Sequence, residues 1–331
     1  MPESLNKTKF SLESSRILLT GGTGFFGRSI LRKLLIDHSL GQSKTSVVVL
    51  SRSPKKFLLS YPEFQNLPWL NFYRGDVLEY TSLPADGAFC QILHAATEST
   101  IGPTFPALKR YDAIVNGTRN ILDYAVKNKV KRILLTSSGG VYGPQPATIK
   151  KVPESYLGIP DPLDPMSAYS MGKRAAEHLC SLYSDRFGVE SVIARCFSFV
   201  GKDLPLNAHF AIGNFIHDAL YSDQINVAGD GTPVRSYMNQ ADLAEWLFCI
   251  LDRGIAGRAY NVGSNEQISV GDLAYLVRDI LSPDKSVVFK RKNDVYQGRN
   301  IYIPDLESAK NDLKLEVQIS LIESINEFLN E

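Results

Sequence analysis

The glycine-rich segment from Thr20 to Gly27 constrains the fold more than any other part of the chain. It reads Thr-Gly-Gly-Thr-Gly-Phe-Phe-Gly, follows an apolar run at 16–20 and precedes apolar residues at helical spacing over 26–37. Glycine lets backbone N–H groups approach a pyrophosphate closely, and a helix N-terminus adds partial positive charge. This order predicts a dinucleotide site whose contacts are Gly21, Gly24, Phe25, Phe26 and Gly27.

Short apolar runs alternate with helical patterns through the first 200 residues. The pattern predicts strands at 16–20, 46–50, 70–74, 91–95, 132–136 and 191–194, and helices over 26–37, 111–128 and 167–187. The last helix is expected to begin at Asp164-Pro165 and to end at Gly188. Continuous β-branched runs between helices favour a parallel sheet that is covered on both faces. With right-handed crossovers, the sequence predicts an α/β fold with a doubly wound parallel sheet of the Rossmann type.

The rhythm changes after about residue 200, where loops rich in Gly, Pro, Asn and Asp separate short elements. A return strand is predicted at 259–262, with helices over 270–281, 306–313 and 320–329. We expect segments 14–200 and about 236–262 to form the dinucleotide-binding domain. Segments 201–235 and 263–331 are expected to form a smaller, interleaved C-terminal lobe that closes over a cleft and binds the substrate.

Composition excludes several classes of function. A net charge of +1 over 331 residues offers no bulk attraction to nucleic acid or to an anionic membrane. The four cysteines form no C-x-x-C pair, which argues against a metal site and favours buried free thiols. The sequence has no apolar run of about 18 residues, and its start lacks the apolar core of a signal peptide. We therefore expect a cytoplasmic protein that spans no membrane.

The end of the second predicted strand bears on the choice between NAD and NADP. An acidic residue there favours NAD, but the strand ends in Ser51 and Arg52, which suit a 2′-phosphate. The sequence therefore leans toward NADP, although Arg52 can instead stack on adenine or face solvent. After the third strand, Asp76 and Val77 are placed to meet the adenine, unless Asp76 is only an exposed loop residue.

Tyr169 and Lys173 form a Y-x-x-x-K pair early in the helix predicted over 167–187. Residues four apart share one helix face, and an ammonium beside a phenol is expected to lower the phenol's pKa. Of the 15 tyrosines, only Tyr169 has a lysine four residues later. This spacing predicts Tyr169 as a general acid and base, with Lys173 also holding the nicotinamide ribose.

Ser138 lies just beyond the fifth predicted strand, at the sheet edge where open sheets bind ligands. Its hydroxyl is predicted to hydrogen-bond the reacting substrate oxygen. Ser137 competes for this role, and both hydroxyls can instead satisfy the backbone of the turn.

Several motifs resemble, in order, those of the NAD-dependent epimerase/dehydratase family. They are the glycine turn, His94-Ala95-Ala96-Thr97, Asn116-Gly117-Thr118, Ser137–Gly143, the Tyr169/Lys173 pair, Gly229-Asp230-Gly231 and Asn261-Val262-Gly263. The resemblance covers about residues 14 to 330 and implies an extended short-chain dehydrogenase that acts on a nucleotide sugar. It implies Ser138, Tyr169 and Lys173 as the catalytic set, and Ala95, Ala96, Thr97 and Asn116 along the cofactor. It also implies a homodimer that pairs the helices predicted over 111–128 and 167–187.

The chain departs from the family pattern at the residues before Val141-Tyr142-Gly143. In the 4,6-dehydratases and sugar-acid decarboxylases of the family that this chain resembles, acidic residues occupy one or both of these positions, whereas this chain has Gly139 and Gly140. Two glycines supply neither acid nor base, which argues against 4,6-dehydration unless another loop provides an acid.

The residues expected to meet the substrate follow the sixth predicted strand. Ser198 replaces the asparagine that is frequent in the family, and Asn207, His209 and Asn214 are expected to face the sugar or its diphosphate. For His209, a loop histidine with purely structural bonds is the alternative. Arg235 resembles the family arginine that clamps the diphosphate, and Arg299 is a candidate second contact.

Three functions fit these patterns. The first is a nucleotide-sugar 4-epimerase that works through a 4-keto intermediate. The second is an NADP-dependent 4-ketoreductase, which the Ser51-Arg52 strand end favours. The third, a non-catalytic cofactor sensor on the same fold, is disfavoured because Ser138, Tyr169 and Lys173 are all present. Surface polysaccharide synthesis is a setting suggested only by the family analogy.

Overall fold

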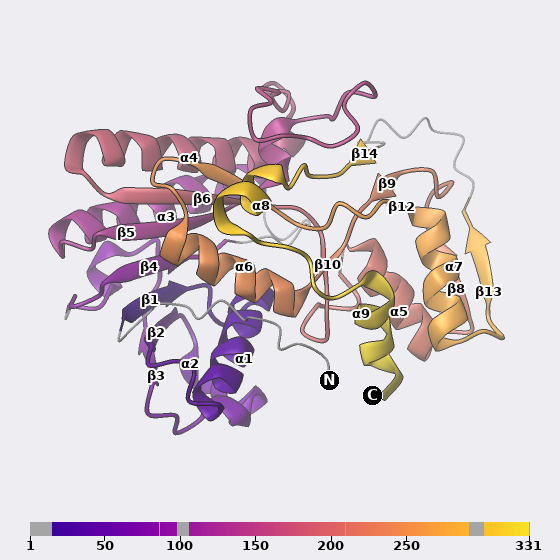
Figure 1. Ribbon diagram of the computed structural model, residues 1–331, viewed down its shortest axis with the longest axis horizontal. Helices are drawn as coiled ribbons and strands as arrows, with labels where there is room; N and C mark the ends of the chain where they lie inside the picture. The colour runs from indigo at the N-terminus through magenta and orange to yellow at the C-terminus, as the bar shows by residue number, and fades with distance from the viewer. Residues whose placement is uncertain (1–14, 86, 98–105, 209, 291–300, 331) are drawn as a thin grey trace, which may run out of the picture.

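A seven-stranded parallel sheet forms the centre of the molecule (Figure 1). The computed structural model describes residues 15–85, 87–97, 106–208, 210–290 and 301–330. The strands lie in the order β11-β6-β5-β4-β1-β2-β3. Their bounds are β1 Arg16–Thr20, β2 Ser46–Ser51, β3 Leu70–Arg74, β4 Gln91–His94, β5 Arg132–Ser138, β6 Glu190–Cys196 and β11 Ala259–Val262. The order reverses between β1 and β4, which is the point where open α/β sheets bind their ligands. The predicted doubly wound fold is confirmed.

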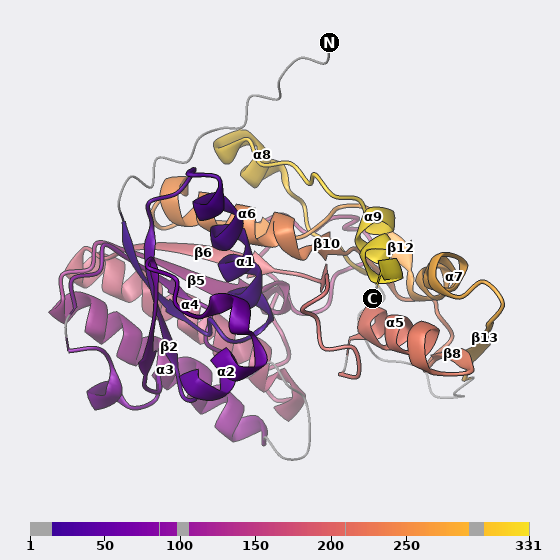
Figure 2. The same cartoon turned by 90° about the horizontal axis from the view of Figure 1, so that it is seen from below.

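Helices cover both faces of this sheet (Figure 2). α1 (Phe25–Ser39), α6 (Gln240–Arg253) and α8 (Glu307–Leu313) lie on one face, and α3 (Ala107–Lys127) and α4 (Ala168–Phe187) lie on the other. Successive strand residues point to opposite faces, so Leu19 packs in the cluster of α1 and α6 while Leu18 packs in the cluster of α3 and α4. This double burial explains why the strands are continuous apolar runs.

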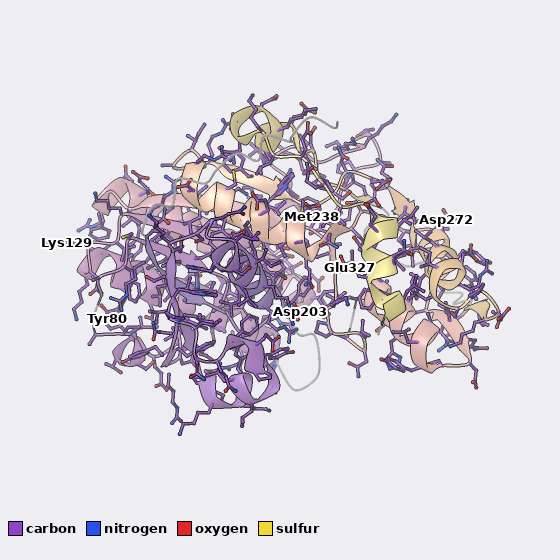
Figure 3. All side chains as sticks on the ribbon, turned by 60° about the horizontal axis from the view of Figure 1, so that its bottom comes forward. Tyr80, Lys129, Asp203, Met238, Asp272 and Glu327 are labelled. Carbon is purple, nitrogen blue, oxygen red and sulfur yellow. The ribbon has the colours of Figure 1, made fainter. Side chains whose placement is uncertain are left out.

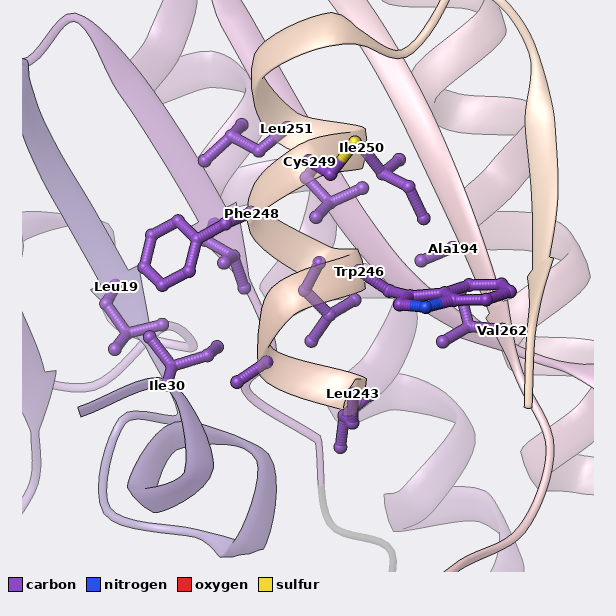
Figure 4. Close-up of a cluster of buried hydrophobic side chains, with 14 of the residues drawn as sticks. Leu19, Ile30, Ala194, Leu243, Trp246, Phe248, Cys249, Ile250, Leu251 and Val262 are labelled. Carbon is purple, nitrogen blue, oxygen red and sulfur yellow. The ribbon is translucent and has the colours of Figure 1, made fainter. Parts of the chain in front are cut away.

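α6 is the helix most deeply buried against the sheet. Figure 4 shows Phe248 directed toward Leu19 and Ile30, while Trp246 lies beside Val262. Trp246 is 1% exposed and Phe248 is 3% exposed. Burying side chains of this size stabilises the fold by about 1.5–3 kcal/mol each. Ten of the 14 residues of α6 are buried, so the helix packs against its surroundings on most of its sides.

A smaller lobe follows the sheet along the chain. It contains α5 (Ala211–Tyr221), β8 (Gln224–Val227), β9 (Val234–Arg235), β12 (Ile268–Ser269), α7 (Val270–Leu281), β13 (Ser286–Phe289), β14 (Ile301–Tyr302), α9 (Leu321–Asn326) and η5 (Glu327–Asn330). β13 pairs in parallel with β8, and α5, α7 and α9 share an apolar cluster. The short strands β7 (Phe199–Val200) and β10 (Met238–Asn239) pair with each other. The domain boundaries expected from the sequence stay a prediction.

The remaining short elements complete the chain. They are α2 (Pro54–Ser60), η1 (Pro62–Phe64), η2 (Tyr80–Ser82), η3 (Gly139–Tyr142) and η4 (Pro165–Ser167). Asp164 caps η4 by accepting a hydrogen bond from the Met166 N–H at 2.9 Å, and Gly188 ends α4 in the left-handed conformation. The sequence therefore identified both end residues, Asp164 and Gly188. The cap at Asp164 belongs to η4, however, and α4 begins at Ala168.

Some expectations from the sequence were wrong. The region after residue 200 contains the helices α5 and α6 where only short elements and loops were expected. Cys90 is exposed just before the first residue of β4, whereas Cys180, Cys196 and Cys249 are buried as free thiols. Among the described helices, none combines the length and apolar character needed to cross a membrane.

Candidate active site

A cavity of about 1680 Å³ opens where the carboxyl ends of the parallel strands meet the smaller lobe. Residues from the glycine turn, from the ends of β2, β4 and β5, from α4 and from the lobe line it. A cavity of this size exceeds the usual range for one small ligand. It can therefore hold a dinucleotide and a second ligand together.

The glycine turn lies at the floor of the cavity. Gly21, Gly24, Phe25 and Phe26 line it, whereas Gly27 does not. Gly21 has a φ of +72°, and a Cβ atom there would lie 2.5 Å from the Ala95 carbonyl carbon, so only glycine fits against the segment after β4. A Cβ atom at Gly27 would lie 2.2 Å from the Gly22 Cα, so Gly27 serves the packing of α1 on the turn.

The adenosine end of the cavity is built by the ends of β2 and β3. Ser51 is buried, Arg52 is exposed, and both line the cavity. Asp76 and Val77 also line it, and the Asp76 carboxylate accepts a hydrogen bond from the Leu78 N–H at 3.0 Å. Asn116 instead lies exposed on α3 and is not among the lining residues, whereas Ala113 of the same helix is.

The proposed catalytic side chains lie together at the centre of the cavity. Ser138, Tyr169 and Lys173 all line it, and Ser138 is hydrogen-bonded to the Tyr169 phenol. The Lys173 Nζ donates hydrogen bonds to the Thr97 hydroxyl and to the Thr136 carbonyl, each at 2.6 Å. This Nζ lies 6.0 Å from the centre of the Tyr169 ring.

The electrostatics of the pair differ from the simple expectation that Lys173 lowers the pKa of Tyr169. Burial raises the pKa of the Tyr169 phenol, and nearby Tyr302 raises it further, while the Ser138 hydrogen bond and Arg110 act in the opposite direction. Burial also lowers the pKa of Lys173 to about 8, against the effect of Cys196 and Glu177. Burial removes water from both groups and so disfavours the charged form of each. The Lys173 ammonium is directed at oxygen atoms of Thr97 and Thr136.

A buried histidine holds the segment that runs along the cofactor side of the cavity, and sequence reasoning missed this role. The Thr20 hydroxyl accepts a hydrogen bond from the Ala96 N–H at 3.1 Å and lies 2.7 Å from the His94 Nδ1. The His94 Nε2 lies 3.2 Å from the Thr118 hydroxyl, so each ring nitrogen is hydrogen-bonded to a threonine hydroxyl. Burial first and Lys173 second lower the pKa of His94 to about 3, so the ring is neutral.

At Gly139 and Gly140, an added side chain would meet the ends of neighbouring side chains, which would have to move. A Cβ atom at Gly139 would lie 2.6 Å from the Tyr302 hydroxyl oxygen and 2.7 Å from the Phe197 ring. A Cβ atom at Gly140 would lie 2.6 Å from the Ser170 hydroxyl oxygen. The sequence showed the missing acids, but the crowding by Tyr302 comes from β14, far away along the chain.

The residues expected to bind substrate fall into two groups. Ser198, Asn214 and Arg235 line the cavity, and the Arg235 Nη1 donates to the Val234 carbonyl at 2.8 Å. Asn207 is exposed and is not a lining residue. The expected contacts His209 and Arg299 lie outside the described residues.

Other lining residues escaped sequence reasoning. They include Arg28, Asn226, Thr232 and Tyr237. Arg28 follows the glycine turn directly, which was the available signal, but nothing in the local sequence shows that its side chain reaches the cavity. The others come from loops and short strands whose placement depends on the lobe.

The donor set fits an NAD or NADP dinucleotide. The glycine turn and the N-terminus of α1 suit its pyrophosphate, Ser51, Arg52 and Asp76 suit the adenosine end, and Lys173 suits the nicotinamide ribose. Within the described residues, no group of three or more His, Cys, Asp or Glu side chains is arranged to hold a metal ion.

Comparisons with known proteins agree with this site. Residues 17–263 match the model of the NAD dependent epimerase/dehydratase family. The chain is 31% identical to UDP-glucuronic acid decarboxylase 6 of Arabidopsis thaliana, over 98% of this chain and 91% of that protein. It is similar to dTDP-glucose 4,6-dehydratase from Streptomyces venezuelae, solved with NAD bound, at 25% identity and a TM-score of 0.81, over 95% and 96% of the two chains.

The fold is also that of UDP-glucose 4-epimerase from Thermotoga maritima. That structure has a TM-score of 0.80 and 22% identity, and the similarity covers 95% of this chain and 97% of the other. Because the family model spans most of the chain and a relative above 30% identity spans nearly all of it, the protein is an enzyme of the NAD dependent epimerase/dehydratase family.

Proposed function

We propose that the protein is an NAD(P)-dependent nucleotide-sugar 4-epimerase. The observation that carries this proposal is the presence of Ser138, Tyr169 and Lys173 in one cavity that continues to Arg235 of the lobe. The cavity therefore offers a proton-transfer group at its centre and a cation for a diphosphate farther along. Its volume of about 1680 Å³ suits a dinucleotide and a nucleotide sugar together.

In the proposed reaction, Tyr169 accepts the proton of the sugar's C4 hydroxyl and later returns a proton to the new C4 oxygen. Ser138, hydrogen-bonded to the phenol, steadies the charge that develops on that oxygen. NAD(P)⁺, when bound beside Lys173, would accept one hydride and later return it. Between the two steps the 4-keto sugar turns over, so that hydride returns to its other face and the configuration at C4 inverts.

The crowding around Gly139 and Gly140 supports epimerisation over 4,6-dehydration or decarboxylation. Neither position carries a carboxylate, and a side chain at either would displace Tyr302, Phe197 or Ser170. The similarity to a UDP-glucuronic acid decarboxylase and to a dTDP-glucose 4,6-dehydratase supports a nucleotide-sugar substrate. We do not carry over the decarboxylase or dehydratase activity, because Gly139 and Gly140 offer no carboxylate beside Val141.

The substrate contacts of this proposal come from the lobe. Ser198 and Asn214 are proposed to meet the sugar, and Arg235 the diphosphate, since all three line the cavity. A guanidinium binds phosphate oxygens in a bidentate manner. Asn207, His209 and Arg299 stay predicted contacts, as does Asn116 for the cofactor.

An NADP-dependent 4-ketoreductase is the second candidate. The Ser51-Arg52 pair lines the cavity and favours NADP, which suits a net reduction by an exchanging cofactor. The same Tyr169 would then donate a proton to the C4 carbonyl oxygen in one direction only.

Absorbance of the purified protein separates the two candidates. UDP-, dTDP-, GDP- and CDP-sugars are screened by thermal shift with NAD⁺ and NADP⁺, and those that bind are then incubated with enzyme. A C4 epimer formed without net change at 340 nm supports the epimerase. Steady loss of NADPH with a 4-keto sugar supports the reductase and rejects the epimerase. Release of CO₂ from UDP-glucuronic acid rejects both.

A further inference from the structure

A group of charged side chains joins the cofactor helix α1 to the loop that follows β7. Asp203 lies in this loop, and its side chain is 4% exposed. Its carboxylate accepts hydrogen bonds from the Arg32 Nε at 2.7 Å and from the Arg32 Nη2 at 3.1 Å. The Arg28 Nε lies 3.4 Å from the same carboxylate, and the Arg28 Nη2 donates to the Asp203 carbonyl. In Figure 3, Asp203 lies between the purple N-terminal elements and the lobe of α5 and α7.

A residue of α6 holds the same loop from another side. The Gln240 Oε1 accepts a hydrogen bond from the Asp203 N–H at 3.0 Å, and the Gln240 Nε2 donates to the Asp203 carboxylate at 3.2 Å. Gly201 makes this approach possible, because its φ is +156° and a Cβ atom there would lie 2.4 Å from the Gln240 Oε1. The loop is therefore fixed to α1 and α6 through one buried aspartate.

Both ends of this connection reach the cavity. Arg28 lines it one residue after the glycine turn, and Leu204 and Pro205 line it immediately after Asp203. The Phe26 ring also packs edge-on against the Phe199 ring, with centres 5.1 Å apart. If the first turn of α1 shifts, the loop must therefore shift with it, because otherwise the contacts of Arg28 with Asp203 and of Phe26 with Phe199 break.

We propose that Asp203 is a positioning residue that couples the dinucleotide site to the nucleoside diphosphate site. A dinucleotide seated on the glycine turn holds the start of α1, and through Arg28, Arg32 and Asp203 it holds the loop wall that the second ligand meets. The dinucleotide has then already ordered the loop. The second ligand does not have to order it and therefore binds more tightly. This inference rests on the proposed nucleotide-sugar function of the same cavity.

The test measures the affinity of the full chain for UDP and dTDP by calorimetry, with and without saturating NADP⁺ or NAD⁺. For the wild type, the dinucleotide is expected to tighten binding of the nucleoside diphosphate about fivefold or more. The dinucleotide affinity must change by the same factor when the nucleoside diphosphate is present, because coupling is reciprocal. In Asp203→Asn the ratio is expected to fall toward one.

Two further variants keep the test specific. Arg32→Lys retains the charge but loses the bidentate contact with Asp203, and Arg32 does not line the cavity, so a reduced ratio is expected there too. Glu245→Gln is the matched control, because it breaks the 2.6 Å ion pair between Lys33 of α1 and α6 without touching the loop. It should keep the wild-type ratio.

The outcomes separate this inference from the proposed function. A wild-type ratio of one, or an unchanged ratio in folded Asp203→Asn, overturns the coupling while the nucleotide site stands. If Asp203→Asn does not fold, Arg32→Lys decides, and a wild-type ratio there overturns the coupling. If neither nucleoside diphosphate binds at any dinucleotide concentration, the inference and the proposed function fall together.

Discussion

Tyr169 lies in surroundings that oppose its ionisation. Burial raises the pKa of its phenol, and the hydrogen bond with Ser138 offsets only part of that effect. To accept the C4 hydroxyl proton, Tyr169 must first lose its own proton, and a cation beside the phenol, such as the nicotinamide ring of bound NAD(P)⁺, would favour that phenolate.

The first prediction at this scale concerns that proton. Tyr169→Phe removes the phenolic oxygen and keeps the ring, so turnover should fall at least ~100-fold while the fold is retained. Steady-state kinetics on the sugar identified by the screen would measure the change, with thermal unfolding as the check on folding. Wild-type turnover in a folded variant would reject Tyr169 as the acid and base.

A second prediction concerns the charge on Lys173. Burial lowers the pKa of this ammonium to about 8, while Cys196, Glu177 and Cys180 raise it, and His94 beside it is neutral. The charge is therefore present below pH about 8 and is lost as the pH rises, so kcat/KM should decline through that range. Arginine stays protonated, so any turnover kept by Lys173→Arg should lack this alkaline decline. The same decline in both proteins would assign it to another group.

At the scale of elements, the packing of α1 on the glycine turn depends on a missing side chain. Gly27→Ala would place a Cβ atom 2.2 Å from the Gly22 Cα, so backbone must move. We expect a loss of about 1–3 kcal/mol in the free energy of unfolding in urea, together with weaker dinucleotide binding. Gly229→Ala is the stability control, because no atom lies within 4 Å of its added Cβ. Equal stability of the two variants would contradict this account.

The start of α6 offers another prediction about elements. Asn239 caps α6 by accepting from the Ala241 N–H at 2.7 Å, and it also donates to Ser324 at 3.1 Å and to Glu327 at 2.9 Å. Asn239→Ala should cost about 2 kcal/mol, at the upper end for a lost cap, because α6 also loses its bonds to α9 and η5. Ser269→Ala, which removes the cap of α7 at Asp272, should cost about 1 kcal/mol. Urea denaturation compares them, and equal costs would show that the bonds from Asn239 to Ser324 and Glu327 contribute little.

At the scale of the whole molecule, the family resemblance predicts a homodimer formed by α3 and α4. Light scattering should then give about twice the chain mass of 36.7 kDa. Leu182, on α4, has a 50% exposed side chain, so Leu182→Asp should favour the monomer if this face is the interface. A wild-type monomer would contradict the prediction. A dimer that survives Leu182→Asp would place the interface elsewhere.

Much of the site could be read from local sequence. The glycine turn, the Ser51-Arg52 strand end, Ser138 and the Tyr169/Lys173 pair each depend on a strand, a turn or one helix face. Of the contacts predicted there, Gly27 alone does not line the cavity. Asn116 and Asn207 did not join them, because exposure on a helix or in a loop depends on what packs against it. α6 was missed as well, although its apolar residues recur at helical spacing.

Local pattern was therefore sufficient to predict the doubly wound sheet, its glycine turn and the catalytic spacing, because apolar runs, turn residues and helical spacing mark each of them in the sequence. Contacts between distant segments decided the rest. Tyr302 fills the space beside Gly139, His94 is held by Thr20 and Thr118, and Asp203 joins a loop to α1. Such contacts exist only after the chain has folded, since their partners are brought together by packing, burial and desolvation.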